Sequence, residues 1–172
     1  MTVRDARPED VPELARVHVE TWEATYRGLL PDALINSFTI EKRIAQWNEW
    51  LGSADNPVHS FAAADETGAL VGFASSGMAR AGCGFDGKLF GLYVHPRAQR
   101  SGAGRALTSA AARYLAAAGC RSMWVWVLAA NPACGFYERL GGQLAAREVR
   151  DLYGFKVDEV AYGWDSLDVL TA

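Results

Sequence analysis

Gln99-Arg100-Ser101-Gly102-Ala103-Gly104-Arg105 follows a nearly continuous apolar run at 88–94 and opens an alanine-rich segment at 102–118. The apolar run is typical of a β-strand that is buried on both faces. The alanine-rich segment repeats apolar residues at helical spacing. The sequence therefore predicts a strand, a glycine-rich loop and a long helix. A further strand is expected at 122–128, and a right-handed crossover would make it parallel to the first.

Gly102 and Gly104 lie where the long helix is expected to begin. Without side chains at these two positions, the unpaired amides of the first helical turn can approach an anion closely, and the helix dipole favours negative charge there. Arg100 and Arg105 add positive charge beside them. The loop therefore predicts a phosphate-binding site, although the same glycines are also compatible with a tight turn and nothing more.

Periodic segments and turn residues complete the expected fold. We expect a short strand at 3–6, helices at 10–28, 40–51 and 132–140, and further strands at 58–64, 69–78, 143–149 and 157–164. This order predicts an α/β fold with a mixed, mostly antiparallel sheet and helices on both faces. No repeat or linker interrupts the 172 residues, so we expect a single domain that spans residues 1–172.

Composition argues against several classes of protein. Half of the residues are hydrophobic and the net charge is −3, which argues against disorder and against a nucleic-acid-binding surface. No stretch approaches ~18 uninterrupted apolar residues, and the N-terminus lacks the apolar core of a signal peptide, so we expect no membrane partner. Cys83, Cys120 and Cys134 are odd in number and lack C-x-x-C spacing. We therefore expect reduced thiols, no metal site and a cytoplasmic location.

Two other phosphate-binding loops fail on residue identity. A P-loop requires a lysine directly after its last glycine, and the segment 96–105 contains no lysine. A dinucleotide-binding fingerprint requires Gly or Ala where Leu107 stands, and an acidic residue at the end of the next strand, but 123–128 contains none. A nicotinamide-dependent oxidoreductase is therefore supported only by the two glycines.

Several motifs together resemble the GNAT family of N-acetyltransferases, and the resemblance extends nearly from end to end. Gln99-x-x-Gly102-x-Gly104 matches the [QR]-x-x-G-x-[GA] signature of that family. The segment 92–96 is similar to its fourth strand, and Asn131 with 136–142 is similar to its N…[FY]-Y-E-x-x-G block. The segment 22–31 resembles the opening of one bacterial branch. The resemblance implies an acyl-CoA N-acyltransferase fold whose sheet splays at the fourth strand.

The resemblance also implies roles for individual residues, with acetyl-CoA as co-substrate and no metal. Main-chain groups of Leu92, Tyr93 and Val94 would bind the pantetheine arm, and Asn131 would hydrogen-bond it. Tyr137 would be the general acid at the thioester sulfur. Asn131 and Tyr137 are six positions apart, whereas seven is commoner in the family. The loop would bind the rest of the cofactor, with the amides of 100–105 on the pyrophosphate; its residues are Gln99, Arg100, Ser101, Gly102, Ala103, Gly104 and Arg105.

The implied reaction is direct attack of a primary amine on the thioester of acetyl-CoA within a ternary complex. Removing a proton from an amine with a pKa of ~10.4 costs roughly 4–5 kcal/mol at pH 7, so the base matters more than the acid. The related branch often has a glutamate opening its fourth strand, where this chain has Lys88. The sequence does not identify the base among the remaining candidates, Glu20, Glu23, Asp86 and His95.

The missing base keeps a second hypothesis open, a non-catalytic acyl-CoA-binding or sensing module with the same fold. The acceptor also stays open among small polyamines, amino acids, antibiotic amines and protein N-termini, and homodimerisation is common in the family. Aromatic residues of the first two helices, with Tyr153 and Phe155, are expected to wall the acceptor pocket, since they lie opposite the cofactor side in the family.

Overall fold

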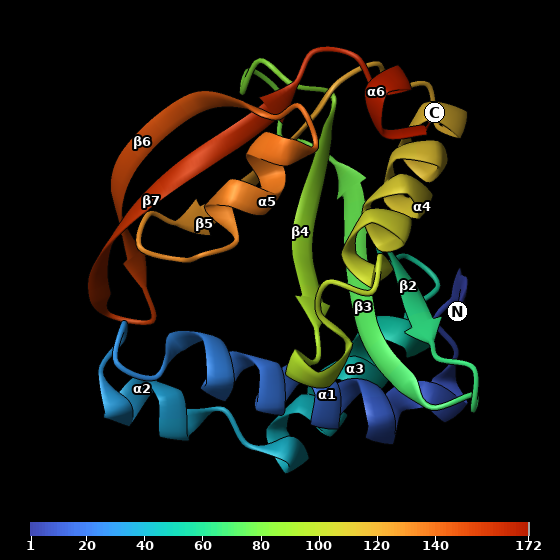
Figure 1. The fold of residues 1–172 in the computed structure, drawn as a ribbon, viewed down its shortest axis with the longest axis vertical. Coiled ribbons are helices and arrows are strands. Elements are labelled where there is room, and N and C mark those ends of the chain that lie inside the picture. The colour runs from blue at the N-terminus through green and yellow to red at the C-terminus, as the bar shows by residue number, and fades with distance from the viewer. Residues whose placement is uncertain (172) are drawn as a thin grey trace.

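The computed structural model describes residues 1–171 and folds them around one seven-stranded sheet (Figure 1). The strand order is β1-β2-β3-β4-β5-β7-β6. Neighbouring strands are antiparallel except β4 and β5, which are parallel as predicted. This confirms the predicted α/β fold with a mixed, mostly antiparallel sheet. The strands are β1 (Thr2–Asp5), β2 (Val58–Ala64), β3 (Leu70–Met78), β4 (Gly87–Val94), β5 (Met123–Leu128), β6 (Gln143–Leu152) and β7 (Phe155–Trp164).

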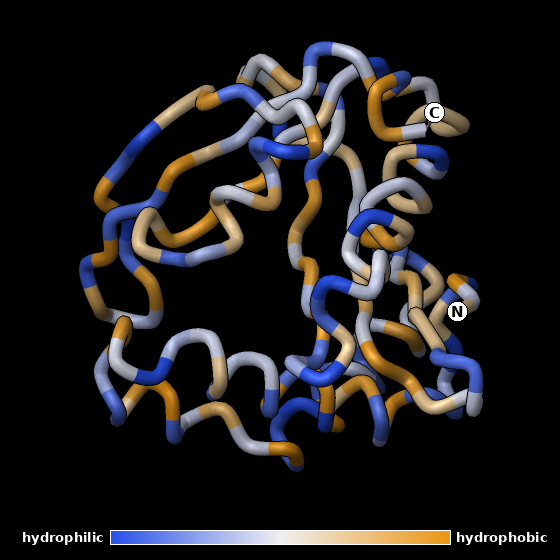
Figure 2. The backbone as a smooth tube through the Cα atoms, in the orientation of Figure 1, coloured by the Kyte–Doolittle hydropathy of each residue, from blue (hydrophilic) through white to orange (hydrophobic). Residues whose placement is uncertain are grey.

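Helices cover both faces of the sheet, also as predicted. The side chains of β2 alternate between the two faces: Phe61 and Ala63 pack with α4, whereas Ala62 packs with α1 and α3. In Figure 2, hydrophobic and hydrophilic residues alternate along α1, as expected for a helix with one buried face. The helices are α1 (Val11–Tyr26), α2 (Asp32–Ser37), α3 (Ile40–Gly52), α4 (Ala103–Ala117), α5 (Cys134–Arg139) and α6 (Asp168–Thr171).

The short helices α2 and α6 were not predicted, because segments of six and four residues are too short to show helical periodicity. Tertiary packing stabilises both of them. Leu34 and Ile35 of α2 are buried against Trp22 of α1. Leu170 of α6 is buried in the same core cluster as Leu115 of α4. The same segments would have little reason to be helical in isolation.

β4 and β5 are paired only along their first halves. The register joins Gly87 to Met123, Lys88 to Trp124 and Leu89 to Val125, and stops there. β4 nevertheless continues beside β3 as far as Val94, and β5 continues beside β7 as far as Leu128. The sheet therefore opens between residues 90–94 and 126–128, which agrees with the splay that the family resemblance implied.

A β-bulge accounts for the start of this opening. Ser75 of β3 pairs with Gly91, and the next residue, Ser76, pairs with Leu89, so Phe90 is an extra residue in β4. A bulge bends its strand and increases the local twist. β4 therefore turns away from β5 at the residue where their pairing ends.

The chain contains no helix, within residues 1–171, that is both long enough and apolar enough to cross a bilayer.

Candidate active site

The loop between β4 and α4 presents unpaired amides at the start of α4. Gly102 is the N-cap residue with φ of 93°, and Arg100 has φ of 61°, so both adopt the left-handed conformation. The helical hydrogen bonds begin with the Ala106 amide, which donates to the Gly102 carbonyl at 3.0 Å. The amides of residues 103–105 therefore precede the hydrogen-bonded ladder, and no side chain caps them. With the helix dipole, this end of α4 can bind an anion.

The two glycines of the loop have different structural roles. Gly102 has the positive φ that an L-residue adopts only at a cost. A Cβ atom on Gly104 would lie 3.1 Å from the Phe136 ring of α5, a tight contact that would require the ring to shift slightly. Gly104 therefore serves the contact between α4 and α5 as well as access to the amides, a role that sequence reasoning did not foresee.

Side-chain hydrogen bonds hold the rest of the loop in place. The Gln99 Nε2 group donates to the Val94 carbonyl at 3.2 Å, and the Ser101 hydroxyl donates to the Ala98 carbonyl at 2.6 Å. The first bond ties the loop to the end of β4. The loop amides and the open edge of Leu92, Tyr93 and Val94 thus belong to one continuous segment.

Asn131 and Tyr137 lie on the other side of the opening, before and within α5. The Asn131 Oδ1 atom accepts from the Ala133 amide at 2.9 Å, and its Nδ2 group donates to the Tyr26 hydroxyl at 3.3 Å. Asn131 therefore orders the turn before α5 and orients Tyr26. Tyr137 is buried, and burial raises its pKa, with smaller contributions from Tyr26 and Cys134. Its phenol therefore stays protonated at neutral pH.

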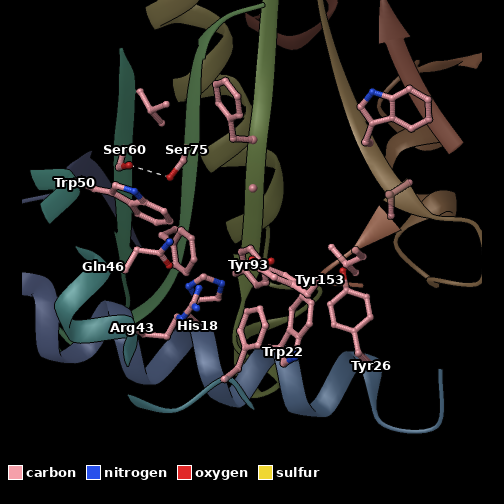
Figure 3. A pocket seen from close by; sticks show the side chains of 18 of the residues that line it. His18, Trp22, Tyr26, Arg43, Gln46, Trp50, Ser60, Ser75, Tyr93 and Tyr153 are labelled. Carbon is pink, nitrogen blue, oxygen red and sulfur yellow. Dashed lines mark hydrogen bonds between the residues drawn. The ribbon is translucent and has the colours of Figure 1, made fainter. Parts of the chain in front are cut away.

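A pocket of about 390 Å³ lies on the opposite face of the opening from α4 (Figure 3). Both strands of the opening contribute to it, β4 through Phe90, Gly91 and Tyr93, and β5 through residues 126–128. Neither the loop 99–105 nor Tyr137 is among its lining residues. The remaining walls come from α1, α3, β2, β3, β7, the β6–β7 turn and the segments on either side of α3. Their lining residues are His18, Trp22, Tyr26, Phe38, Arg43, Gln46, Trp50, Asn56, Val58, Ser60, Phe73, Ser75, Leu152, Tyr153 and Glu159.

The expected aromatic wall is therefore present in part. Trp22, Tyr26 and Tyr153 line the pocket. Phe155 instead packs into the cluster around Trp22, outside the lining, and Trp47 of α3 is fully buried in the core. Whether this pocket receives the acceptor stays a prediction.

None of the four base candidates from the sequence lines the pocket. The Asp86 carboxylate accepts from the backbone amides of Arg121 and Ser122, and these hydrogen bonds lower its pKa. Glu23 pairs with Arg27 on the exposed side of α1. The Glu20 Oε2 atom lies 2.8 Å from His95 Nε2 and also pairs with Arg16. Glu20 thus links Arg16 of α1 to His95 at the end of β4 through its carboxylate.

Glu159 of β7 is the carboxylate that sequence reasoning missed. Among residues 1–171, it is the only acidic residue in the pocket lining. Its Oε2 atom lies 3.3 Å from Arg150 Nη1, and its charge raises the pKa values of Tyr26 and Lys88. Burial is the larger cause of the raised pKa of Tyr26. Burial lowers the pKa of Lys88 by more than the charge of Glu159 raises it, so the pKa of Lys88 lies below its ordinary value. Glu159 therefore acts on residues of both α1 and β4. The sequence carried only a weak signal, because Asp158 and Glu159 stand side by side in the predicted closing strand and the strand alternation places them on opposite faces.

His18 is the buried imidazole of the pocket wall. Its ring packs against those of Phe73 and Tyr93, with centroid separations of 5.1 and 4.5 Å. Burial, with a smaller effect of Arg43, lowers the pKa of His18 to about 3. His18 is therefore neutral at physiological pH. Within residues 1–171, no group of three or more His, Cys, Asp or Glu side chains is placed to hold a metal ion.

Comparison with known proteins places this geometry in context. The model of the Acetyltransferase (GNAT) family matches residues 17–142. The uncharacterized N-acetyltransferase YuaI of Bacillus subtilis (strain 168) is 36% identical over 171 residues, which cover 99% of this chain and 96% of YuaI. The aminoglycoside N(6')-acetyltransferase type 1 of Stenotrophomonas maltophilia is 33% identical over 152 residues, 80% of this chain and 86% of that protein.

Solved structures share the fold. The PaiA N-acetyltransferase of Thermoplasma acidophilum, determined in complex with coenzyme A, matches with a TM-score of 0.70 at 20% identity. The match covers 92% of this chain and 96% of that one.

The buried His18 predicts a specific pH dependence of stability. Below its ordinary pKa of 6.5 the unfolded chain binds a proton that the folded chain does not, so stability falls as the pH drops from 6.5 toward about 3. At about pH 5 this one residue should lower the free energy of unfolding by about 2 kcal/mol. Urea unfolding at pH 7.5 and 5 measures the loss. His18→Gln should lose about that much less stability than the wild type over the same interval; equal losses would contradict the assignment.

Proposed function

Because the chain belongs to the acetyltransferase (GNAT) family and is an acetyl-CoA-dependent N-acyltransferase, we propose that it acetylates a primary amine by direct attack within a ternary complex. The observation that carries this proposal is the opening between β4 and β5, with the free amides of a helix start on one face and a pocket on the other. Two reactants approaching from the two faces would meet at the opening, and holding them there supplies much of the rate.

On the cofactor face, the pyrophosphate of acetyl-CoA would bind the amides of residues 100–105. The pantetheine arm would follow the unpaired edge of Leu92, Tyr93 and Val94, where a strand partner is missing. The Oδ1 atom of Asn131 and one N–H of its Nδ2 group already form hydrogen bonds within the protein. The Nδ2 group carries a second N–H, and this donor would bind the pantetheine arm.

On the acceptor face, Glu159 would receive the proton that the ammonium form of the acceptor must lose before attack. The amine nitrogen then forms a bond to the carbonyl carbon of the thioester, and a tetrahedral oxyanion results. Its collapse breaks the carbon–sulfur bond. Tyr137, protonated at neutral pH because burial raises its pKa, would donate a proton to the departing sulfur. The second proton of the nitrogen leaves as the amide forms and restores the phenol through solvent.

The acceptor class is supported only at the level of amines. One relative is by name an aminoglycoside acetyltransferase, which is consistent with a primary amine acceptor, either a small molecule or a peptide. Homodimerisation, the cytoplasmic location and the span of the domain over residues 1–172 stay predictions.

The proposed function is tested by thiol release from acetyl-CoA against a panel of primary amines. Release with at least one amine supports transfer to an amine. Tight coenzyme A binding without release across a broad panel would instead favour the non-catalytic module of the same fold.

Tyr137→Phe should lower turnover with such an amine by about 10²-fold or more and leave acetyl-CoA affinity nearly unchanged, because only the proton donor is removed. The ring keeps its packing against Phe136 and Tyr162. Steady-state kinetics and calorimetric titration with coenzyme A separate the two effects. Turnover equal to that of the wild type would remove Tyr137 from the mechanism.

Gly102→Ala should weaken coenzyme A binding by about 10-fold, because a left-handed residue with a Cβ costs roughly 1–2 kcal/mol and relaxes by shifting the amides. Gly119→Ala is the matched control, since Gly119 follows the other end of α4 with φ of 90° and open space around it. Both variants should lose similar stability, and Gly119→Ala should keep its affinity. Equal affinities in the two variants would argue against pyrophosphate binding at this loop.

Glu159→Gln should lower turnover by about 10²-fold or more with little change in acetyl-CoA affinity, because the glutamine keeps the shape but cannot take a proton. Glu66→Gln removes the same charge in the exposed turn between β2 and β3, outside the pocket lining, and should behave as the wild type. If the two variants turn over equally fast, Glu159 is not the base.

A further inference from the structure

We infer that the acceptor carries a carboxylate in addition to its amine, and that Arg43 of α3 binds this carboxylate. The inference deepens the proposed function, because it takes the pocket as the acceptor site. It selects among the amine classes that the sequence left open.

Arg43 lines the pocket without an acidic partner. Its guanidinium carbon lies over the Phe38 ring, 4.3 Å from the ring centroid, so a cation–π contact helps to hold the group in place. Within residues 1–171, no carboxylate lies at salt-bridge distance from it. Arg16, Arg27 and Arg150, by contrast, each pair with a glutamate. A fixed, unpaired guanidinium beside a cavity is suited to an anion from outside the chain.

Two neighbouring polar groups of the same wall also lack protein partners. The Arg43 Nε group, the Gln46 Oε1 atom and the His18 Nδ1 atom are all buried without a hydrogen bond from residues 1–171. Figure 3 shows these three side chains close together at one end of the pocket. Most buried polar groups in proteins are hydrogen-bonded, and leaving one unpaired is costly. Three such groups at one place indicate a polar ligand group at that end.

The guanidinium of Arg43 can bind a carboxylate in a specific way. The planar fork of an arginine binds the two oxygens of a carboxylate or of a phosphate through parallel hydrogen bonds. A phosphate group would bring about two negative charges to a lining with a single positive side chain, whereas a carboxylate brings one.

The charges in the pocket argue against an acceptor with several positive groups. The lining offers one carboxylate, Glu159, which already pairs with Arg150, and one positive charge, Arg43. His18 adds no charge at physiological pH. A polyamine or an aminoglycoside would bring several ammonium groups to a wall with a single acidic side chain. An acceptor with one amine and one carboxylate balances both charged residues of the lining.

The uncharged part of the lining indicates an apolar body for the acceptor. Aromatic rings recur in the lining, among them those of Trp22, Phe73, Tyr93 and Trp126. Arg43 projects from α3 and Glu159 from β7, so the two charged residues lie on different walls. The carboxylate of the acceptor would face α3 while its amine faces the opening between β4 and β5. The predicted class is an apolar amino acid, with the spacing between amine and carboxylate left to experiment.

The test compares amino acids with their carboxamides, which keep the shape and the amine but lose the negative charge. Suitable probes are phenylalanine, 4-(aminomethyl)benzoic acid and 6-aminohexanoic acid, each with its amide. Thiol release from acetyl-CoA gives kcat/KM, and quenching of tryptophan fluorescence by each probe in the presence of coenzyme A gives binding without turnover. The proteins are the wild type, Arg43→Gln, Arg43→Lys and Lys42→Gln. Lys42 is an exposed cation beside Arg43 on α3 and does not line the pocket.

The wild type should prefer at least one acid over its amide by about 10-fold or more in kcat/KM and in binding. Arg43→Gln should lose this preference, Arg43→Lys should keep part of it, and Lys42→Gln should keep all of it. Thermal unfolding checks that each variant is folded.

The two hypotheses fail in different ways. Amides that bind and react as well as the acids, or a preference that survives in Arg43→Gln, would overturn the carboxylate site and leave the amine transferase intact. Acids that bind through Arg43 while no amine releases thiol would support the carboxylate site and contradict the proposed reaction. If Arg43→Gln is unfolded, Arg43→Lys provides the test. Its preference for an acid over the matching amide must then be weaker than that of the wild type, and an equal preference would overturn the carboxylate site.

Discussion

The loss of pairing between β4 and β5 beyond Leu89 and Val125 is the constraint on which the rest of the structure depends. Each of the two strands keeps its other neighbour, so the sheet stays continuous while its centre opens. The extra residue Phe90 bends β4 at this point. A fully paired sheet would have no edge for a ligand and no passage between its faces. The backbone N–H and C=O groups of β4 beyond Leu89 have no partner in β5, so they remain available to hydrogen-bond a ligand or water.

The opening separates two different chemical environments. On the α4 side, backbone amides and a helix dipole provide positive potential without a buried charged side chain. On the α1–α3 side, aromatic rings surround a few polar groups, which is typical of a pocket for a small organic molecule. Tyr26 connects the two sides, because its hydroxyl accepts from Asn131 before α5 while its ring lines the pocket. The arrangement suits a reaction in which two molecules meet at one point.

The pocket departs from the usual rule that buried polar groups are paired within the protein. Arg43, Gln46 and His18 each keep a buried polar atom without a partner in the chain. Such groups lower stability unless a ligand pairs with them, and they discriminate strongly between ligands that can pair and ligands that cannot. Residues of this kind tend to mark function rather than folding.

The amino-acid sequence by itself determined the fold class, the parallel crossover from β4 to β5 and the glycine-rich turn that opens α4, because these features depend on local periodicity and on glycines close together in the chain. The gathered motifs also led to the correct family. The tertiary structure alone revealed the packing role of Gly104, the short helices α2 and α6, and the pairing of Glu20 with His95. It alone brought Arg43 and Glu159 to one pocket and left Asp86 and Glu23 outside it. Arg43 and Glu159 are more than a hundred positions apart in the chain. Local sequence patterns cannot predict that they line one pocket, because only the packing of α3 and β7 around the opening brings them together.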